Sequence, residues 1–184
     1  MTPIIPFQPG AIPANTPGAM FAPGTTGPDF LTALMDLIRG SQQLRLWVGW
    51  KFGEGPYGSL GFDVVKAWDE RVPQEAGYPY LVLSDYDESG PGLTYEDFPI
   101  KATVNVFGTS VDQVRRIAAA VKRLVDPVNM NPDATPRPGL VCSKGVESYN
   151  TRDSSRPQFM GLGRSGVYVY VESIDYTFIV NPYQ

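Results

Sequence analysis

Five carboxylates fall close together in the middle of the chain and are the residues best placed for chemistry: Asp85, Asp87, Glu88, Glu96 and Asp97. Acidic side chains at short, regular intervals are the ligands that Ca²⁺ prefers. Asp85, Asp87 and Glu96 occupy the first, third and twelfth positions of a calcium-loop pattern, and Gly90 occupies the sixth. The spacing therefore raises a metal-binding hypothesis.

Two further positions of the same pattern do not fit a calcium loop. Ser89 stands at the fifth position and Pro91 at the seventh, and the flanking segments are predicted to be strands, where a calcium loop has helices. A solvated acidic hairpin loop explains the same residues, and we favour it. We assign no metal, cofactor-binding or catalytic residue.

The composition narrows the classes of function. The 184 residues include no histidine, which removes the commonest general base and metal ligand. Cys142 is the single cysteine and has no histidine to activate it as a nucleophile. A net charge of −4 is not a nucleic-acid-binding footprint, and no apolar run is long enough for a membrane span. Nothing in the sequence supports an enzyme.

The elements that must position the acidic segment are a strand on each side and a helix behind them. Residues 78–84 form a short apolar run, and residues 85–99 are acidic and rich in turn residues. In residues 100–107 apolar and polar side chains alternate, which predicts a strand with one core face. After Gly108 the apolar spacing changes to 3.6, and Ser110 with Gln113 forms a capping-box pattern, so a helix is predicted over 111–125.

Elements on either side complete the predicted domain. Asp29 is a good N-cap for a helix over 30–39. Aromatic and β-branched residues predict a strand over 44–52 and a short extended piece over 62–68. Residues 126–139 read as a long loop and 140–149 as a strand, whereas residues 150–164 are polar and glycine-rich. Residues 165–180 predict a long strand with a bulge near 172–174, where the alternation changes phase.

Residues 1–28 form a separate segment that is rich in proline and glycine, so packed secondary structure is not expected there. One interpretation is a disordered tail. The other is an extended arm that docks its apolar residues on a neighbouring subunit. The apolar residues available for docking are Ile4, Ile5, Phe7, Ile12, Met20 and Phe21.

The predicted helix over 111–125 also carries a basic face. Arg115, Arg116, Lys122 and Arg123 lie off its apolar stripe. This face either docks an acidic surface, for example at a subunit interface, or is simply solvated. Together the elements predict one α+β domain over 29–184, with an antiparallel or mixed sheet and helices packed on one face.

Several of these segments resemble the tail terminator (tail completion) family of long-tailed bacteriophages. The resemblance is carried mainly by residues 65–126, and the helix over 30–39 and the strand over 168–179 match in order. The matching motifs are Ala67-Trp-Asp-Glu-Arg-Val-Pro73, Tyr78-Pro-Tyr-Leu-Val-Leu83, the strand Ile100–Phe107, and the helix Ser110–Leu124 with its Val-x-x-Ile-Ala-x-x-Val-x-x-Leu stripe.

The resemblance implies a structural virion protein that forms a homohexameric ring on the end of the tail tube. Such a ring ends tube polymerisation and joins the tail to the head-side connector or stopper protein, with DNA passing through the lumen. It implies assembly in the host cytoplasm and final location in the virion neck. On this reading we predict that the 85–97 loop faces the lumen or the tube and that the 1–28 arm reaches an adjacent protein.

The chain departs from the family in the 1–28 arm, in residues 44–63 and in the loop over 127–139. These departures leave another neck, head-completion or minor tail protein as an alternative. A third hypothesis is a small metal-dependent hydrolase that uses the acidic 85–97 segment.

Overall fold

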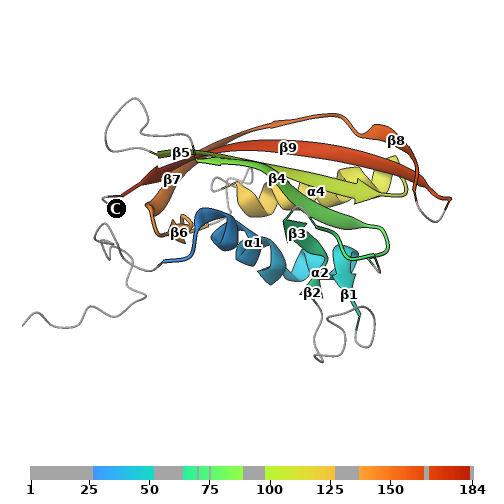
Figure 1. Ribbon diagram of the computed structural model, residues 1–184, viewed down its shortest axis with the longest axis horizontal. Coiled ribbons are helices and arrows are strands. Elements are labelled where there is room, and N and C mark those ends of the chain that lie inside the picture. Colours follow the sequence, from blue (N-terminus) through green and yellow to red (C-terminus); the bar gives the residue numbers. More distant parts are fainter. Residues whose placement is uncertain are drawn as a thin grey trace, which may run out of the picture.

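The computed structural model describes residues 27–51, 64–69, 71–74, 76–88, 98–126, 137–163 and 166–182. They form an α+β structure in which helices lie against one side of a curled sheet (Figure 1). The helices are α1 (Phe30–Gly40), α2 (Gln42–Val48) and α4 (Val111–Val125). The strands are β1 (Gly49–Trp50), β2 (Val64–Val65), β3 (Ala67–Asp69), β4 (Tyr80–Glu88), β5 (Phe98–Gly108), β6 (Val141–Cys142), β7 (Gly145–Ser154), β8 (Gln158–Leu162) and β9 (Tyr168–Asn181).

Seven strands form the main sheet in the order β3-β4-β5-β9-β7-β6, and β8 also pairs with β9. The sheet is mixed because β3 runs parallel to β4, whereas the other pairs are antiparallel. β7 pairs with the later part of β9 and β8 with its beginning, so the two follow one another along the same edge. β1 and β2 form a separate two-stranded ribbon.

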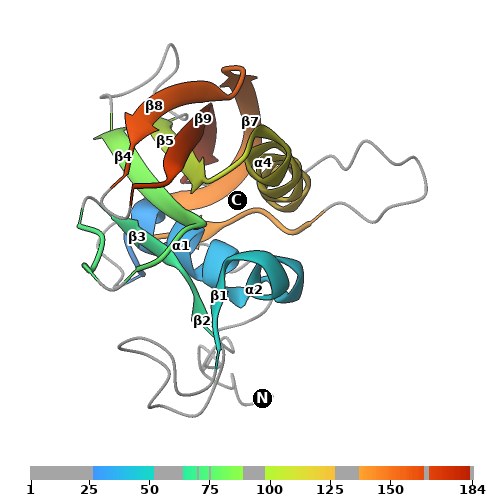
Figure 2. The ribbon, with the colours of Figure 1, turned by 90° about the vertical axis from the view of Figure 1, so that its right-hand side faces the viewer.

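The core lies between the sheet and the helices α1 and α4, as two perpendicular views show (Figures 1 and 2). The apolar members of the alternating strand β5 are buried, which confirms the predicted core face. Both predicted helices also have the predicted bounds to within a residue. The fully buried residues that meet in this layer include Phe30, Leu34 and Ile38 of α1, Val114, Ile117 and Val121 of α4, Ile100, Val104 and Val106 of β5, and Ile174, Tyr176, Phe178 and Val180 of β9.

Local hydrogen bonds start both long helices as the sequence predicts. The Asp29 carboxylate accepts from the Thr32 amide at 2.6 Å, and the Ser110 hydroxyl accepts from the Gln113 amide at 3.2 Å. The Gln113 side chain accepts from the amide of Thr109, one residue before the cap, at 2.9 Å. The capping box is therefore closed one residue earlier than its usual form.

The strand predicted over 44–52 is wrong for most of its length, because residues 42–48 form the helix α2. Ser41 caps this helix by accepting from the Leu44 amide. Leu44 and Val48 are four residues apart and both are buried in the core. Burial at helical spacing has thus outweighed the β-propensity of the aromatic residues.

Three boundaries in the second half also differ from prediction. Strand β4 continues through Glu88, so the acidic segment begins inside the sheet. The single strand predicted over 140–149 is a hairpin that turns at Ser143–Lys144 and continues as β7, and part of the glycine-rich 150–164 segment is strand β8. Gly145 is required after the turn, since it has a φ of 138° and a Cβ there would lie 2.3 Å from the Asn181 carbonyl oxygen.

The bulge predicted near 172–174 is wrong with respect to β5, because β9 pairs with that strand in continuous register from Tyr170 to Val180. The alternation changes phase because both faces are covered at this point. Val171 lies beside its partner Phe107 on the outer face, and Glu172 lies on the inner face against α4, where it pairs with Lys122.

Candidate interaction surfaces

The acidic segment is only partly placed by the structure. Asp87 lies in β4 opposite Lys101, and the backbones of Asp85 and Glu88 belong to the same strand. Glu96 and Asp97 lie outside the described residues. A calcium loop would coil its first residues around the ion, whereas here they are paired in a sheet. Among the described side chains, no group of three or more His, Cys, Asp or Glu is arranged to hold a metal ion.

The predicted docking residues of the arm, from Ile4 to Phe21, also lie outside the described residues, but the root of the arm does not. The Ser143 amide donates to the Pro28 carbonyl at 2.9 Å, and Gly27 lies against the backbone of Cys142 and Ser143. The arm therefore leaves the domain at the β6–β7 turn, close to the last residue of β9.

The basic face predicted on α4 consists of Arg115, Arg116 and Arg123, which are exposed. Lys122 is instead partly buried and turned towards the sheet, because its ammonium group lies 2.7 Å from the Glu172 carboxylate, whose side chain is only 5% exposed. Arg116 also lines an open groove of about 400 Å³ between α2 and the start of α4, together with Leu46 and Trp47.

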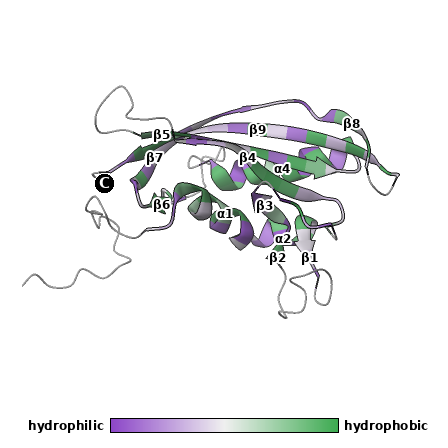
Figure 3. Ribbon diagram, in the orientation of Figure 1, coloured by the Kyte–Doolittle hydropathy of each residue, from purple (hydrophilic) through white to green (hydrophobic). Residues whose placement is uncertain are grey.

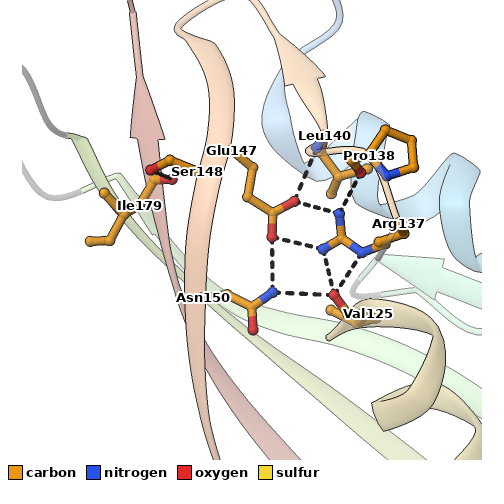
Figure 4. A network of polar contacts seen from close by, with 8 residues as sticks. All are labelled: Val125, Arg137, Pro138, Leu140, Glu147, Ser148, Asn150 and Ile179. Carbon is orange, nitrogen blue, oxygen red and sulfur yellow. Dashed lines mark hydrogen bonds and ion pairs between the residues drawn. The ribbon is translucent and has the colours of Figure 1, made fainter. Parts of the chain in front are cut away.

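A buried polar network joins the end of α4 to β7 (Figure 4). The Arg137 guanidinium contacts both carboxylate oxygens of Glu147 at 2.7 Å, and it also donates to the carbonyl oxygen of Val125, the last residue of α4. Asn150 donates to the same carbonyl and to Glu147, and the Leu140 amide donates to Glu147 at 3.0 Å. This network satisfies the end of the helix and fixes residue 137, where the chain returns from the predicted 126–139 loop.

A second ionic contact lies beside this network. Arg152 of β7 donates to the Asp126 carboxylate, which follows the end of α4, at 2.7 Å. Burial raises the pKa of Asp126 despite the opposing charge of Arg152. Burial, and secondarily the Asp126 charge, raises the pKa of Tyr176 far above its ordinary range. These groups hold α4 against β7 and β9, and we assign them no chemical step.

Among the described residues, five of the eight large apolar side chains that are exposed lie on the β8–β9 hairpin. We call Phe159, Met160, Leu162, Val167 and Tyr168 the hairpin patch. Phe159, Leu162 and Tyr168 are 56%, 69% and 61% exposed. The Phe159 ring lies 5.7 Å from the ring of Tyr168 and 5.6 Å from that of Tyr170. Figure 3 shows apolar residues continuing along this hairpin to the end that extends past α4.

Sequence reasoning missed both the network and the hairpin patch. Residues 158–162 contain three large apolar side chains between Pro157 and Gly163, which is the signal of a short strand, but the polar and glycine-rich surroundings obscured it. No local signal marks Arg137 as a partner of Glu147, because the pair is made only when a loop returns to the sheet. Cys142 is fully buried in the core, where packing accounts for it.

Among the described helices, none combines the length and the apolar character needed to cross a bilayer.

Comparisons with known proteins find a likeness of fold. No protein-family model matches the chain, and no curated protein sequence matches it either. A solved chain from the structure entitled "Virion of native gene transfer agent (GTA) particle" superposes with a TM-score of 0.54 at 13% sequence identity. The alignment covers 83% of this chain and 96% of that one.

Proposed function

We propose that this chain is a structural protein of a phage-like virion, and more specifically the ring that ends the tail tube. The observation that carries the proposal is the fold that it shares, over nearly the whole of the other chain, with a component of a gene transfer agent virion. The resemblance of residues 65–126 to tail terminator proteins supports the finer assignment. No catalytic role is proposed.

The distribution of surfaces supports assembly into a ring. The hairpin patch lies near the beginning of β9, whereas the arm leaves the domain near its end. Contacts between two different surfaces of identical subunits generate rings when the rotation closes. A homohexamer is the closed form that the family resemblance implies.

In this role the partners of the chain are copies of itself, the tail tube protein on one side and the head-side connector on the other. DNA passes through the lumen and is not bound by sequence. A net charge of −4 suits a lumen that DNA must traverse, because a strongly basic lining would retain phosphates. Arg115, Arg116 and Arg123 are then best used against acidic protein surfaces, outside the lumen.

Deletion of the coding sequence from the particle's genome tests the function directly. If the chain ends the tube, electron microscopy will show tails of uncontrolled length that are not joined to heads. Tails of normal length on particles that lose DNA would instead identify a head-completion protein. Light scattering across a concentration series gives a second readout, with a species near six times 20.2 kDa expected.

A further inference from the structure

We propose that residues 1–26 of one copy dock on the hairpin patch of a neighbouring copy. The inference rests on the proposed assembly of several copies, and it names the contact that links them. Three observations carry it: the patch is a core-like surface that no other described element covers, the N-terminal segment has matching chemistry, and residues 27 and 28, to which that segment is joined, lie at the opposite end of the sheet from the patch.

The hairpin patch continues the inner face of the sheet. On β9, Ile174, Tyr176 and Phe178 point to this face and are buried beneath the helices. Tyr168 belongs to the same alternating set, and the register places Leu162 of β8 opposite it. Both side chains are more than half exposed. Contiguous exposed apolar side chains of this kind mark interaction sites.

The N-terminal segment has the composition that this surface requires. Residues 1–26 contain no charged side chain but six prolines and the apolar residues from Ile4 to Phe21. Proline-rich segments dock on surfaces that present aromatic rings, because they lose little conformational entropy on binding. The patch and its border present the rings of Phe159, Tyr168 and Tyr170. Neither partner therefore has to bury a charge.

The geometry favours a neighbouring copy over the same copy. The arm leaves at the β6–β7 turn beside Asn181, whereas the patch begins at Tyr168, and β9 separates them by roughly 45 Å at the usual rise per residue. Exposed Lys101, Asp153 and Asp175 lie on the outer sheet face between these points. An uncharged segment folding back along that face would cross polar surface for most of its length.

A neighbouring copy removes this difficulty. An extended proline-rich segment of 26 residues spans at most roughly 80 Å, which is ample to reach an adjacent subunit. Because the donor and acceptor surfaces differ and lie at opposite ends, each copy gives an arm to one neighbour and receives one from the other. Such a heterologous contact continues from copy to copy until the ring closes.

Disulfide cross-linking between full-length chains tests the contact. One chain carries Ile12→Cys and a second, tagged chain carries Leu162→Cys. Native Cys142 is fully buried and is left in place. The matched control replaces Leu162→Cys with Leu46→Cys, since Leu46 is an exposed apolar residue on α2, outside the patch. We expect the mixed disulfide of tagged and untagged chains to form at least tenfold faster with Leu162→Cys than with Leu46→Cys.

Assembly provides a second readout. The triple variant Phe159→Ser, Leu162→Ser and Tyr168→Ser should shift the light-scattering mass towards the monomer, whereas Leu46→Ser should not. A ring that forms with equal cross-linking at both positions overturns the arm contact and leaves the proposed function standing. The contact is also overturned if the disulfide forms only within one chain, when that chain carries both Ile12→Cys and Leu162→Cys, and if mixing with other chains does not change its yield. Tails of normal length that are joined to heads in the gene deletion would instead count against the proposed function.

Discussion

The two ends of strand β9 have similar sequences and opposite environments. Towards its C-terminus, Phe178 stacks near Tyr176 at 5.4 Å and lies 4.7 Å from the ring of Phe30 in α1. Towards its N-terminus, Tyr168 meets the ring of Phe159 at 5.7 Å and is left 61% exposed. Both ends carry aromatic residues on the inner face, but only one of them lies beneath the helices.

This contrast shows that an alternating strand specifies which face is apolar but not what covers it. At the covered end the protein supplies its own cover, and burial there stabilises the fold. At the uncovered end the same kind of side chain is available to another molecule. Predictions that separate stability from assembly therefore test the comparison directly.

The largest effect is expected from Phe178→Ala at the covered end. Removing a fully buried ring that contacts Phe30 and Tyr176 leaves a cavity, which should lower the free energy of unfolding by about 3 to 5 kcal/mol. Urea denaturation measures the loss. Phe159→Ala is the matched change at the uncovered end and should cost less than about 1 kcal/mol, as surface substitutions do. Equal losses would mean that the hairpin patch is part of the fold's own core.

Two buried carboxylates extend the comparison to charge. Glu147→Gln should cost on the order of 3 kcal/mol, because Arg137 loses its ionic partner in an enclosed site. Glu172→Gln, at the other end of β9, should cost only about 1 kcal/mol, since the Lys122 side chain is 19% exposed and can turn to water. Thermal or urea unfolding of the two variants gives the ranking, and the reverse order would be inconsistent with it.

The loss of a helix cap should lower the stability by the same amount for α1 and for α4. Asp29→Ala and Ser110→Ala each remove the acceptor of one backbone amide, and each should lower the free energy of unfolding by about 1 kcal/mol. Asp29→Ala also removes the exposed hydrogen bond from the Thr32 hydroxyl. Asp29→Asn keeps an acceptor at the cap and serves as the control, with little change expected. A much larger cost for one cap would show that its side chain contributes more than local helix initiation.

The smallest effect concerns the pH dependence contributed by Asp126. Burial raises its pKa in the folded state, so the folded protein holds this proton more tightly than the unfolded chain does. The stabilisation is fully present below the ordinary pKa of 3.8 and is lost as pH rises through the raised value. Relative to Asp126→Asn, the wild type should therefore lose stability over this interval, as urea titrations at several pH values would show. A gain over the same interval would indicate a lowered pKa.

Local signals in the sequence account for the elements that were predicted well. Helices α1 and α4 have their own caps, and their apolar residues recur at helical spacing, so each can be recognised without knowing its neighbours. In strand β5 apolar and polar side chains alternate, so this strand can be recognised in the same way. A sheet with helices on one face follows from these elements in their order, whereas the parallel pairing of β3 with β4 that makes the sheet mixed does not.

Longer-range packing decided the rest. Residues 42–48 became a helix because Leu44 and Val48 both reach the core, which no local propensity indicates. The network of Arg137, Glu147 and Asn150 exists only because a loop brings residue 137 back beside β7. The predicted docking arm and most of the acidic loop stay predictions, since Ile4 to Phe21, Glu96 and Asp97 lie outside the described residues.

The sequence alone thus determined the fold class, the two long helices, the main strands and the absence of histidine chemistry, because these depend on composition and on patterns within a few turns of chain. Only the tertiary structure decided which apolar side chains were covered. Phe178 and Tyr168 are aromatic residues of the same alternating set, and the sequence does not distinguish them. Their exposure differs because the helices cover Phe178 and end before they reach Tyr168. Exposure is a property of that arrangement, and it is what makes the hairpin patch available to a neighbouring copy.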